Sequence, residues 1–175
     1  MRLFVAIDCE AIKDELLLAQ KQFTLLKARF PKCFHLTLHF IGEVNKEETE
    51  TIKKKLSEIK AASFWFKLSQ LGAFASYSQK VIWCGVEESE PLIQLHHKIN
   101  KAITGDDRLR KYTPHITLAR IKKHQKMTET EKRILDVGLK KELGQCSLKV
   151  NHFILYESTI TPQGPIYRVV KEYPV

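Results

Sequence analysis

The residues best suited to chemistry lie in a short pattern that the chain contains twice. His35-Leu-Thr-Leu38 and His115-Ile-Thr-Leu118 both read histidine, apolar residue, threonine, apolar residue, and they begin 80 residues apart. In a chain of 175 residues with seven histidines and 43% apolar residues, roughly 0.08 such matches are expected by chance. Two copies therefore indicate a duplicated unit that supplies one strand from each half to a shared cleft.

The spacing of the pattern suits a β-strand. A histidine and a threonine two positions apart project from the same face, while the apolar residues anchor the other face in the core. If a pseudo-twofold axis relates the two strands, two imidazoles and two hydroxyls surround one small volume. One neutral histidine can then accept a proton from a nucleophile while a protonated one donates to the leaving oxygen, and the threonines hold the non-bridging oxygens of a phosphate. This phosphoryl chemistry requires no metal.

Two other interpretations stay open at this point. His35, His39 and His115 could form a three-histidine zinc site with an open position, although such a site would leave the paired threonines and the duplication unexplained. A basic RNA-binding module without turnover would explain the charge of the chain. It would not explain the histidines, because affinity for phosphate depends on arginine and lysine.

The overall composition narrows the partners and the compartment. The chain has 29 Lys and Arg against 20 Asp and Glu, a net charge of +9, which favours an anionic partner. Residues 108–141 carry eleven of the basic residues and three acidic ones, either as a solvated surface or as a flank that attracts RNA. No apolar stretch approaches the length of a membrane span or a signal-peptide core. Four widely spaced cysteines indicate reduced thiols, and we expect a cytoplasmic protein.

The hydrophobic pattern predicts the elements that position the two motifs. We expect strands at 2–8, 34–40, 64–71, 80–86, 112–121, 148–157 and 166–173, with Gly72 to Gln79 as a connection. We expect helices at 11–29, from an Asn45 capping box to about residue 59, at 91–103 and at 128–139. The order is typical of an α+β fold, and the absence of a linker predicts a single domain over residues 1–175.

The residues around the motifs resemble a known family. The carrying segments are Arg2-Leu-Phe-Val-Ala-Ile-Asp8, His35-Leu-Thr-Leu-His-Phe-Ile-Gly-Glu43, Pro114-His-Ile-Thr-Leu-Ala-Arg120 and Phe153-Ile-Leu-Tyr-Glu-Ser158. They are similar to the bacterial and archaeal RNA 2′,3′-cyclic phosphodiesterases, the LigT-like proteins formerly called 2′-5′ RNA ligases, of the 2H phosphoesterase superfamily. The likeness runs over essentially the whole chain.

This resemblance implies a fold and an activity. It implies two pseudo-symmetric lobes around a central cleft, each a mostly antiparallel sheet with helices on its outer face. It implies hydrolysis of RNA 2′,3′-cyclic phosphate ends to 2′-phosphates, with His35 as proton donor, His115 as proton acceptor, and Thr37, Thr117 and Arg120 binding phosphate. No cofactor or metal is implied, the partner is RNA, and we expect a monomer. Reversible 2′-5′ ligation is the alternative reaction.

Strict strand alternation conflicts with one of these assignments. Arg120 comes five residues after His115, so alternation points it to the opposite face of the strand. Either the strand twists or ends near Ala119, or the arginine reaches around its end. The same alternation puts His39 on the face of His35, where we expect a hydrogen-bonded neighbour rather than a catalyst.

The aromatic residues near the motifs allow two interpretations. Phe4, on the first strand, could stack on a base, but a core position is the better expectation. Trp83 is expected to pack in the core or between the lobes. Tyr156 fits either the core or the cleft.

Overall fold

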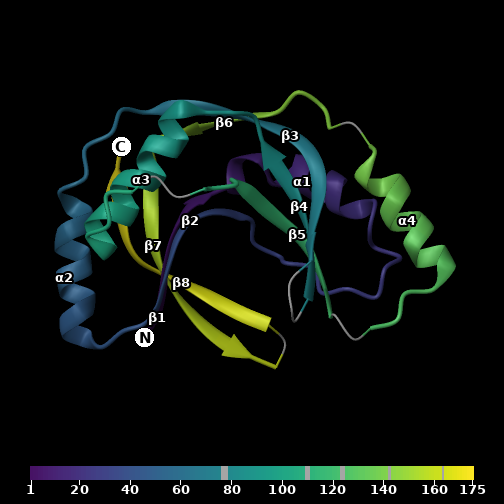
Figure 1. The fold of residues 1–175 in the computed structure, drawn as a ribbon, viewed down its shortest axis with the longest axis horizontal. Coiled ribbons are helices and arrows are strands. Elements are labelled where there is room, and N and C mark those ends of the chain that lie inside the picture. Colours follow the sequence, from purple (N-terminus) through teal and green to yellow (C-terminus); the bar gives the residue numbers. More distant parts are fainter. Residues whose placement is uncertain (76–78, 109–110, 123–124, 142, 163) are drawn as a thin grey trace.

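The computed structural model describes residues 1–75, 79–108, 111–122, 125–141, 143–162 and 164–175. Within these ranges the chain forms eight strands, four α-helices and one short 3-10 helix (Figure 1). In chain order they are β1 (Arg2–Asp8), η1 (Glu10–Ile12), α1 (Lys13–Lys21), β2 (His35–Glu43), α2 (Lys46–Ser57), β3 (Phe64–Ala75), β4 (Gln79–Val86), α3 (Glu90–Thr104), β5 (His115–Lys122), α4 (Glu129–Leu139), β6 (Ser147–Val150), β7 (His152–Thr161) and β8 (Gly164–Pro174). The α+β class expected from the sequence is confirmed.

The strands form an antiparallel sheet with two related halves. The strand order is β6-β3-β4-β5-β2-β1-β7-β8, so two sets of four strands meet where β5 lies beside β2. This junction consists of one residue pair, Leu36 with Ile116. Reading outward from it, β2-β1-β7-β8 corresponds to β5-β4-β3-β6, and each motif strand is the innermost strand of its half.

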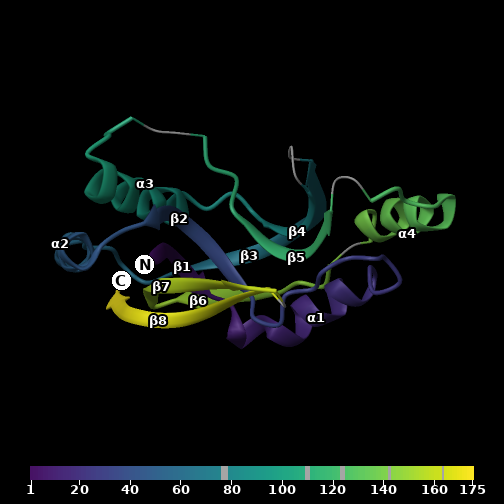
Figure 2. The same cartoon turned by 90° about the horizontal axis from the view of Figure 1, so that it is seen from below.

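Two helices hold the halves together because each packs against the half of the sheet to which its neighbouring strands do not belong. Helix α1 connects β1 to β2 but packs against β5, and α3 connects β4 to β5 but packs against β2. Figure 2 shows α1 and α3 on opposite faces of the sheet. Each half of the sheet is thus covered by a helix that connects two strands of the other half. As a result, one continuous buried core runs through both halves.

Local sequence signals explain several element ends. Asn45 and Glu48 form the expected capping box, in which each side chain accepts a hydrogen bond from the backbone of the other. The left-handed Gly105 ends α3 with φ of 73°, a conformation in which glycine carries no steric cost. The four cysteines form no disulfide, and no helix among the described residues is long and apolar enough to cross a membrane.

Two predicted elements were wrong. The helix expected over 11–29 ends at Lys21, because the turns that follow bury Phe23 and Leu26 and bring Arg29 into a bridge with Arg120. The strand expected over 148–157 is two strands, β6 and β7, which pair with β3 and β1 in different halves. Both errors come from long-range pairing that overrides the local pattern.

Smaller differences concern strand ends. β3 continues to Ala75 and β4 begins at Gln79, so the expected connection from Gly72 is strand up to residue 75. The residues between these strands lie outside the described ranges. β5 begins at His115 rather than at residue 112, and β2 runs on to Glu43.

Gly138 in α4 tests how tightly this helix is packed. In an exposed helix, Gly→Ala stabilises by about 1 kcal/mol. Here a Cβ on Gly138 would lie 2.5 Å from Cε1 of the fully buried Phe23. We predict that Gly138→Ala destabilises the protein by about 1–3 kcal/mol, measured by urea unfolding. Gly144→Ala is the control, because nothing lies within 4 Å of the added methyl group; a more stable Gly138→Ala variant would contradict the packing.

Candidate active site

The two motifs face each other across the junction of the sheet. His35 and His115 are the first residues of β2 and β5. The pair between Leu36 and Ile116 sets an antiparallel register, which brings His35 beside Thr117 and His115 beside Thr37. Alternation turns these four side chains away from the fully buried Leu36 and Ile116. The chain thus folds so that each histidine lies next to the threonine of the other motif.

Both motif strands contain an extra residue at the same place. In β2, Ala6 pairs with Thr37 but Val5 pairs with His39, so Leu38 has no partner. In β5, Trp83 pairs with Thr117 but Ile82 pairs with Ala119, so Leu118 has none. The fourth residue of each motif is therefore a β-bulge, which reverses the alternation of the residues that directly follow it.

The bulge in β5 resolves the position of Arg120. With Leu118 added to the strand, Arg120 returns to the face of His115 and Thr117. Its Nη2 lies 3.4 Å from Thr117 Oγ1, and its charge acts on both His35 and His115. Neither a strand end at Ala119 nor a side chain bent around the strand is needed.

The bulge in β2 has the opposite consequence for His39. It pairs with Val5, which belongs to the core, and it lies close enough to His96 of α3 to lower the pKa of that residue. The expectation that His39 shares the face of His35 was wrong. The three histidines of the zinc alternative are therefore not gathered, and among the described residues no cluster of three or more His, Cys, Asp or Glu is placed to hold a metal.

A buried side chain from another part of the chain stabilises each bulge region. Gln20 of α1 donates from Nε2 to the Leu118 carbonyl at 3.0 Å and to the Pro31 carbonyl at 3.1 Å. The Tyr112 hydroxyl donates to the Thr37 carbonyl at 2.8 Å. A carbonyl that a bulge removes from the ladder needs such a partner when it is buried. No short sequence signal marked Gln20 or Tyr112 for this role.

Aromatic rings surround both histidines. The His35 ring lies 5.1 Å from Phe4 and 5.0 Å from Tyr167 between ring centroids, and Phe4 stacks on Tyr156. Phe4 and Tyr156 therefore form part of the wall beside His35. No sequence pattern indicated that Tyr167 would lie beside His35.

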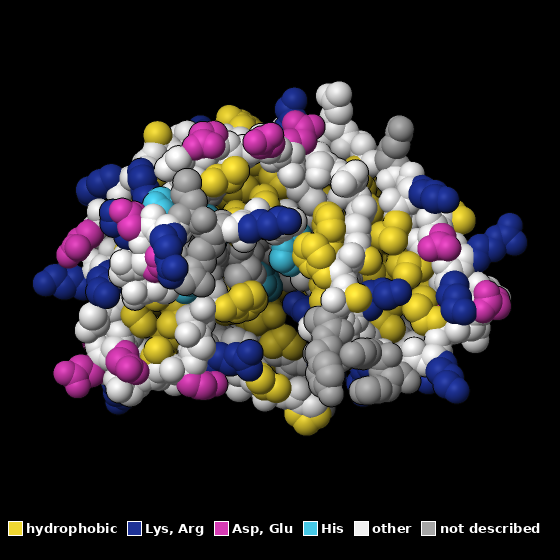
Figure 3. Space-filling view, in the orientation of Figure 1, with side chains coloured by type: hydrophobic (Ala, Val, Ile, Leu, Met, Phe, Trp, Pro, Cys, Tyr) yellow, Lys and Arg dark blue, Asp and Glu magenta, His cyan; other side chains and the backbone are white. Residues whose placement is uncertain are grey.

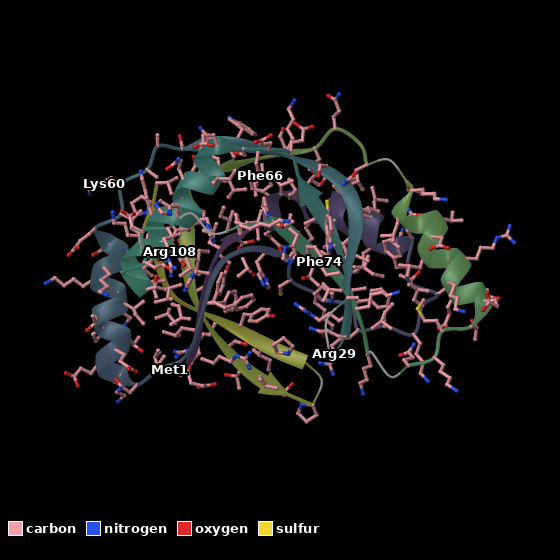
Figure 4. All side chains as sticks on the ribbon, viewed as in Figure 1. Met1, Arg29, Lys60, Phe66, Phe74 and Arg108 are labelled. Carbon is pink, nitrogen blue, oxygen red and sulfur yellow. The ribbon has the colours of Figure 1, made fainter. Side chains whose placement is uncertain are left out.

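His115 has its own aromatic wall. Its ring lies 5.0 Å from Phe74 and 6.3 Å from Trp83, and Figure 4 labels Phe74 on β3. Trp83 is thus a neighbour of the site as well as a packing residue. The sequence analysis missed Phe74 because its strand was expected to end at residue 71.

The surroundings of His115 determine which nitrogen is free. Its Nδ1 lies 2.8 Å from the Thr113 carbonyl, and a carbonyl only accepts, so Nδ1 carries the hydrogen. In the neutral ring the Nε2 lone pair is then available to accept a proton. Burial and the Arg120 charge lower the pKa of His115, although the Thr113 carbonyl opposes this shift. His115 is therefore a neutral base at neutral pH.

His35 is more strongly perturbed. Burial, followed by the charges of Arg120 and His115, lowers its pKa to about 4. In the free protein His35 is neutral near pH 7. An anion bound between these residues would favour the protonated ring and raise this pKa.

A cavity of about 400 Å³ opens at the site. Its lining includes His35, Thr117 and Arg120 together with Arg29, Lys32 and Tyr167. Figure 3 shows histidine atoms at the hollowed middle of one face, with hydrophobic and basic side chains around them. Among the described basic residues of the segment 108–141, only Arg120 belongs to this lining. The role of the rest of the segment toward RNA stays a prediction; Lys122 is exposed at the end of β5, and Lys123 lies outside the described residues.

The fold is that of the LigT-like 2H phosphoesterases. The family model of the 2′-5′ RNA ligase superfamily matches residues 9–159. The RNA 2′,3′-cyclic phosphodiesterase of Methanocaldococcus jannaschii is 32% identical over 180 residues, covering 99% of this chain and all of that protein. The crystal structure of E. coli LigT complexed with 3′-AMP superposes with a TM-score of 0.79 at 26% identity, covering 99% of this chain and 97% of that one. The chain belongs to the 2′-5′ RNA ligase superfamily, and the expected resemblance is confirmed.

Gln20 tests the support of the bulge. Gln20→Leu leaves the buried Leu118 carbonyl without its donor, and we predict a loss of about 1–3 kcal/mol of stability, measured by urea unfolding. Gln22→Leu is the control, because the Gln22 amide donates to the Leu18 carbonyl of the preceding turn in an exposed setting. Equal stability of the two variants would show that the bulge does not depend on Gln20.

The pKa of His35 predicts a stability change with pH. Between pH 6.5 and 4 the unfolded state binds a proton at this residue that the folded state does not, so the free energy of unfolding falls as the pH falls through that window. We predict that His35→Gln makes this fall shallower, by on the order of 1–3 kcal/mol. Urea unfolding at pH 7, 5.5 and 4 measures it. The exposed His152→Gln is the matched control, and a wild-type slope in His35→Gln would contradict a lowered pKa of His35.

Proposed function

We propose that the protein hydrolyses the 2′,3′-cyclic phosphate ends of RNA to 2′-phosphates, without a metal, using His35 and His115 as acid and base. The observation that carries this proposal is the register of β2 and β5, which opposes two histidine–threonine pairs beside Arg120. Relatives at about 30% identity over nearly their whole length are named RNA 2′,3′-cyclic phosphodiesterases, which supports the substrate class.

The reaction uses each histidine once. Nε2 of His115 takes a proton from water as the water oxygen forms a bond to phosphorus. The bond from phosphorus to the ribose O3′ breaks, and His35 donates its proton to that oxygen. The products are a 2′-phosphate and a free 3′-hydroxyl, with His115 protonated and His35 neutral. Exchange with solvent restores the starting protonation of both rings.

Thr37, Thr117 and Arg120 stabilise the phosphate. The threonine hydroxyls donate to the two non-bridging oxygens, whose charge grows as water attacks. Arg120 adds a positive charge that is partly buried, where its interaction with an anion is stronger than in water. Each threonine comes from the strand opposite the histidine it adjoins, so both halves contribute to both ends of the reaction.

The substrate itself prepares His35 as an acid. With a pKa of about 4 in the free protein, His35 is a poor proton carrier near pH 7. The phosphodiester anion offsets the positive charge of Arg120 and favours the imidazolium form of His35. The protonated acid is thus present when substrate is bound, and the alkaline limb of kcat lies at higher pH than that of kcat/KM.

We propose residues 1–175 as one catalytic unit. Each half supplies one histidine, and the exchanged helices α1 and α3 complete the opposite halves. A single chain therefore holds the whole site, and RNA with a cyclic phosphate end is its partner.

The same site could run in the direction of ligation, with an RNA 5′-hydroxyl in place of water. Water is the abundant nucleophile in dilute solution, so hydrolysis is the main reaction. Incubating cyclic-phosphate and 5′-hydroxyl fragments and probing for a 2′-5′ linkage measures the share of ligation. A protein that binds such ends without forming either product would instead be the binding module considered above.

Replacement of either histidine tests the proposal. We predict that His35→Ala and His115→Ala each lower kcat on adenosine 2′,3′-cyclic phosphate by about 10²–10⁴-fold, the usual contribution of a general acid or base. His152→Ala, at an exposed position, keeps wild-type activity, and exhaustive chelation leaves the wild-type rate unchanged. Phosphorus NMR of the product should show the 2′-phosphate. Wild-type turnover in both histidine variants, or a 3′-phosphate product, would refute the assigned roles.

A further inference from the structure

A second arginine lies beside Arg120. The backbone of Arg29 forms an antiparallel bridge with Arg120, with N–H···O distances of 2.8 and 2.9 Å in the two directions. Residues opposite each other in such a pair project from the same face. Because the Leu118 bulge turns Arg120 to the cleft, Arg29 also projects to that side, and both residues line the cavity.

Arg29 and Arg120 place two like charges side by side without an acidic partner among the described residues. None of the described residues places a carboxylate in an ion pair with Arg29 or Arg120, although other exposed arginines such as Arg168 have one. The cavity lining contains Arg29, Lys32 and Arg120 and, within the described part of the chain, no Asp or Glu. This end of the cavity is therefore built for more negative charge than one reacting phosphate carries.

The fold places the extra charge beyond the reacting centre. β2 and β5 pair only at Leu36 and Ile116, and farther along β5 the place of β2 is taken by Arg29. The order along this edge is His115, Thr117 and then Arg120 with Arg29. The Arg29 side chain also borders the tip of the β7–β8 hairpin, since a Cβ on Gly164 would lie 3.7 Å from its Cδ (Figure 4).

We infer that Arg29, with Lys32 beside it, binds the 5′-phosphate of the nucleotide that carries the cyclic phosphate. In an RNA end the nearest other anion is this phosphate, on the side of the ribose away from the 2′,3′ ring. The inference rests on the proposed function and extends it. It makes the enzyme selective for cyclic ends that continue into a chain or carry a 5′-phosphate, over a bare nucleoside 2′,3′-cyclic phosphate.

The test compares ligands that differ only in the 5′-phosphate. Calorimetry gives the Kd of adenosine 2′-phosphate and of adenosine 2′,5′-bisphosphate. In the wild type the 5′-phosphate should tighten binding by ~10- to 100-fold, the range for a charge-assisted hydrogen bond. Arg29→Gln should remove most of this gain, Lys32→Gln part of it, and Arg29→Lys should retain more than Arg29→Gln. Arg133→Gln, which removes the same charge from the exposed face of α4, should keep the wild-type ratio.

Turnover supplies the second measurement. The ratio of kcat/KM for adenosine 5′-phosphate 2′,3′-cyclic phosphate to that for adenosine 2′,3′-cyclic phosphate should fall at least fivefold in Arg29→Gln. A wild type that gains nothing from the 5′-phosphate, or an Arg29→Gln variant that weakens both ligands equally, would overturn the inference. Failure of the wild type to hydrolyse either compound would refute the proposed function, whereas a 5′-phosphate gain in Kd that depends on Arg29 would still establish the anion site.

Discussion

The geometry of the site depends on one constraint, the β-bulge at the fourth residue of each motif. Without Leu118 as an extra residue, Arg120 would face the core side of β5 and an arginine charge would be buried against apolar residues. With it, Thr117 and Arg120 share one face. Gln20 stabilises this arrangement because it donates a hydrogen bond to the Leu118 carbonyl, which the bulge removes from the strand ladder. The same hydrogen bond links α1, which lies between β1 and β2 in the chain, to β5 in the other half of the sheet.

The exchange of helices follows from the narrowness of the junction. One residue pair between β2 and β5 could not by itself hold two four-stranded sheets in a fixed relation. Packing α1 on β5 and α3 on β2 makes the apolar core continuous across that junction. The separation of the two histidines is thereby set by packing that involves the whole chain, as a site with acid and base on different elements requires.

Much of this could be predicted from the sequence, for identifiable reasons. The motif residues alternate locally, so their strands and the face shared by His35 and Thr37 were visible in the pattern. The capping box is likewise a local signal, which spans the four residues from Asn45 to Glu48. The bulges were not visible, because Leu38 and Leu118 are ordinary strand residues whose lack of a partner depends on the neighbouring strand. For that reason alternation placed His39 on the wrong face and conflicted with the site position that the resemblance implied for Arg120. Phe74, Tyr167 and Arg29 approach the site through long-range pairing that no local period records.

The two halves differ in the residues that surround their histidines. Phe40 and Arg120 both follow their bulge by two residues, and they pair with Phe4 and Val81, so they occupy equivalent positions. One half therefore offers an exposed aromatic ring and the other a charge. At the histidines themselves, His115 is held by the Thr113 carbonyl, which fixes its Nε2 as an acceptor. His35 is enclosed by Phe4 and Tyr167, and its low pKa makes protonation depend on a bound anion. Two related strands thus carry two unlike imidazoles, and this difference is the basis on which we propose His115 as the base and His35 as the acid.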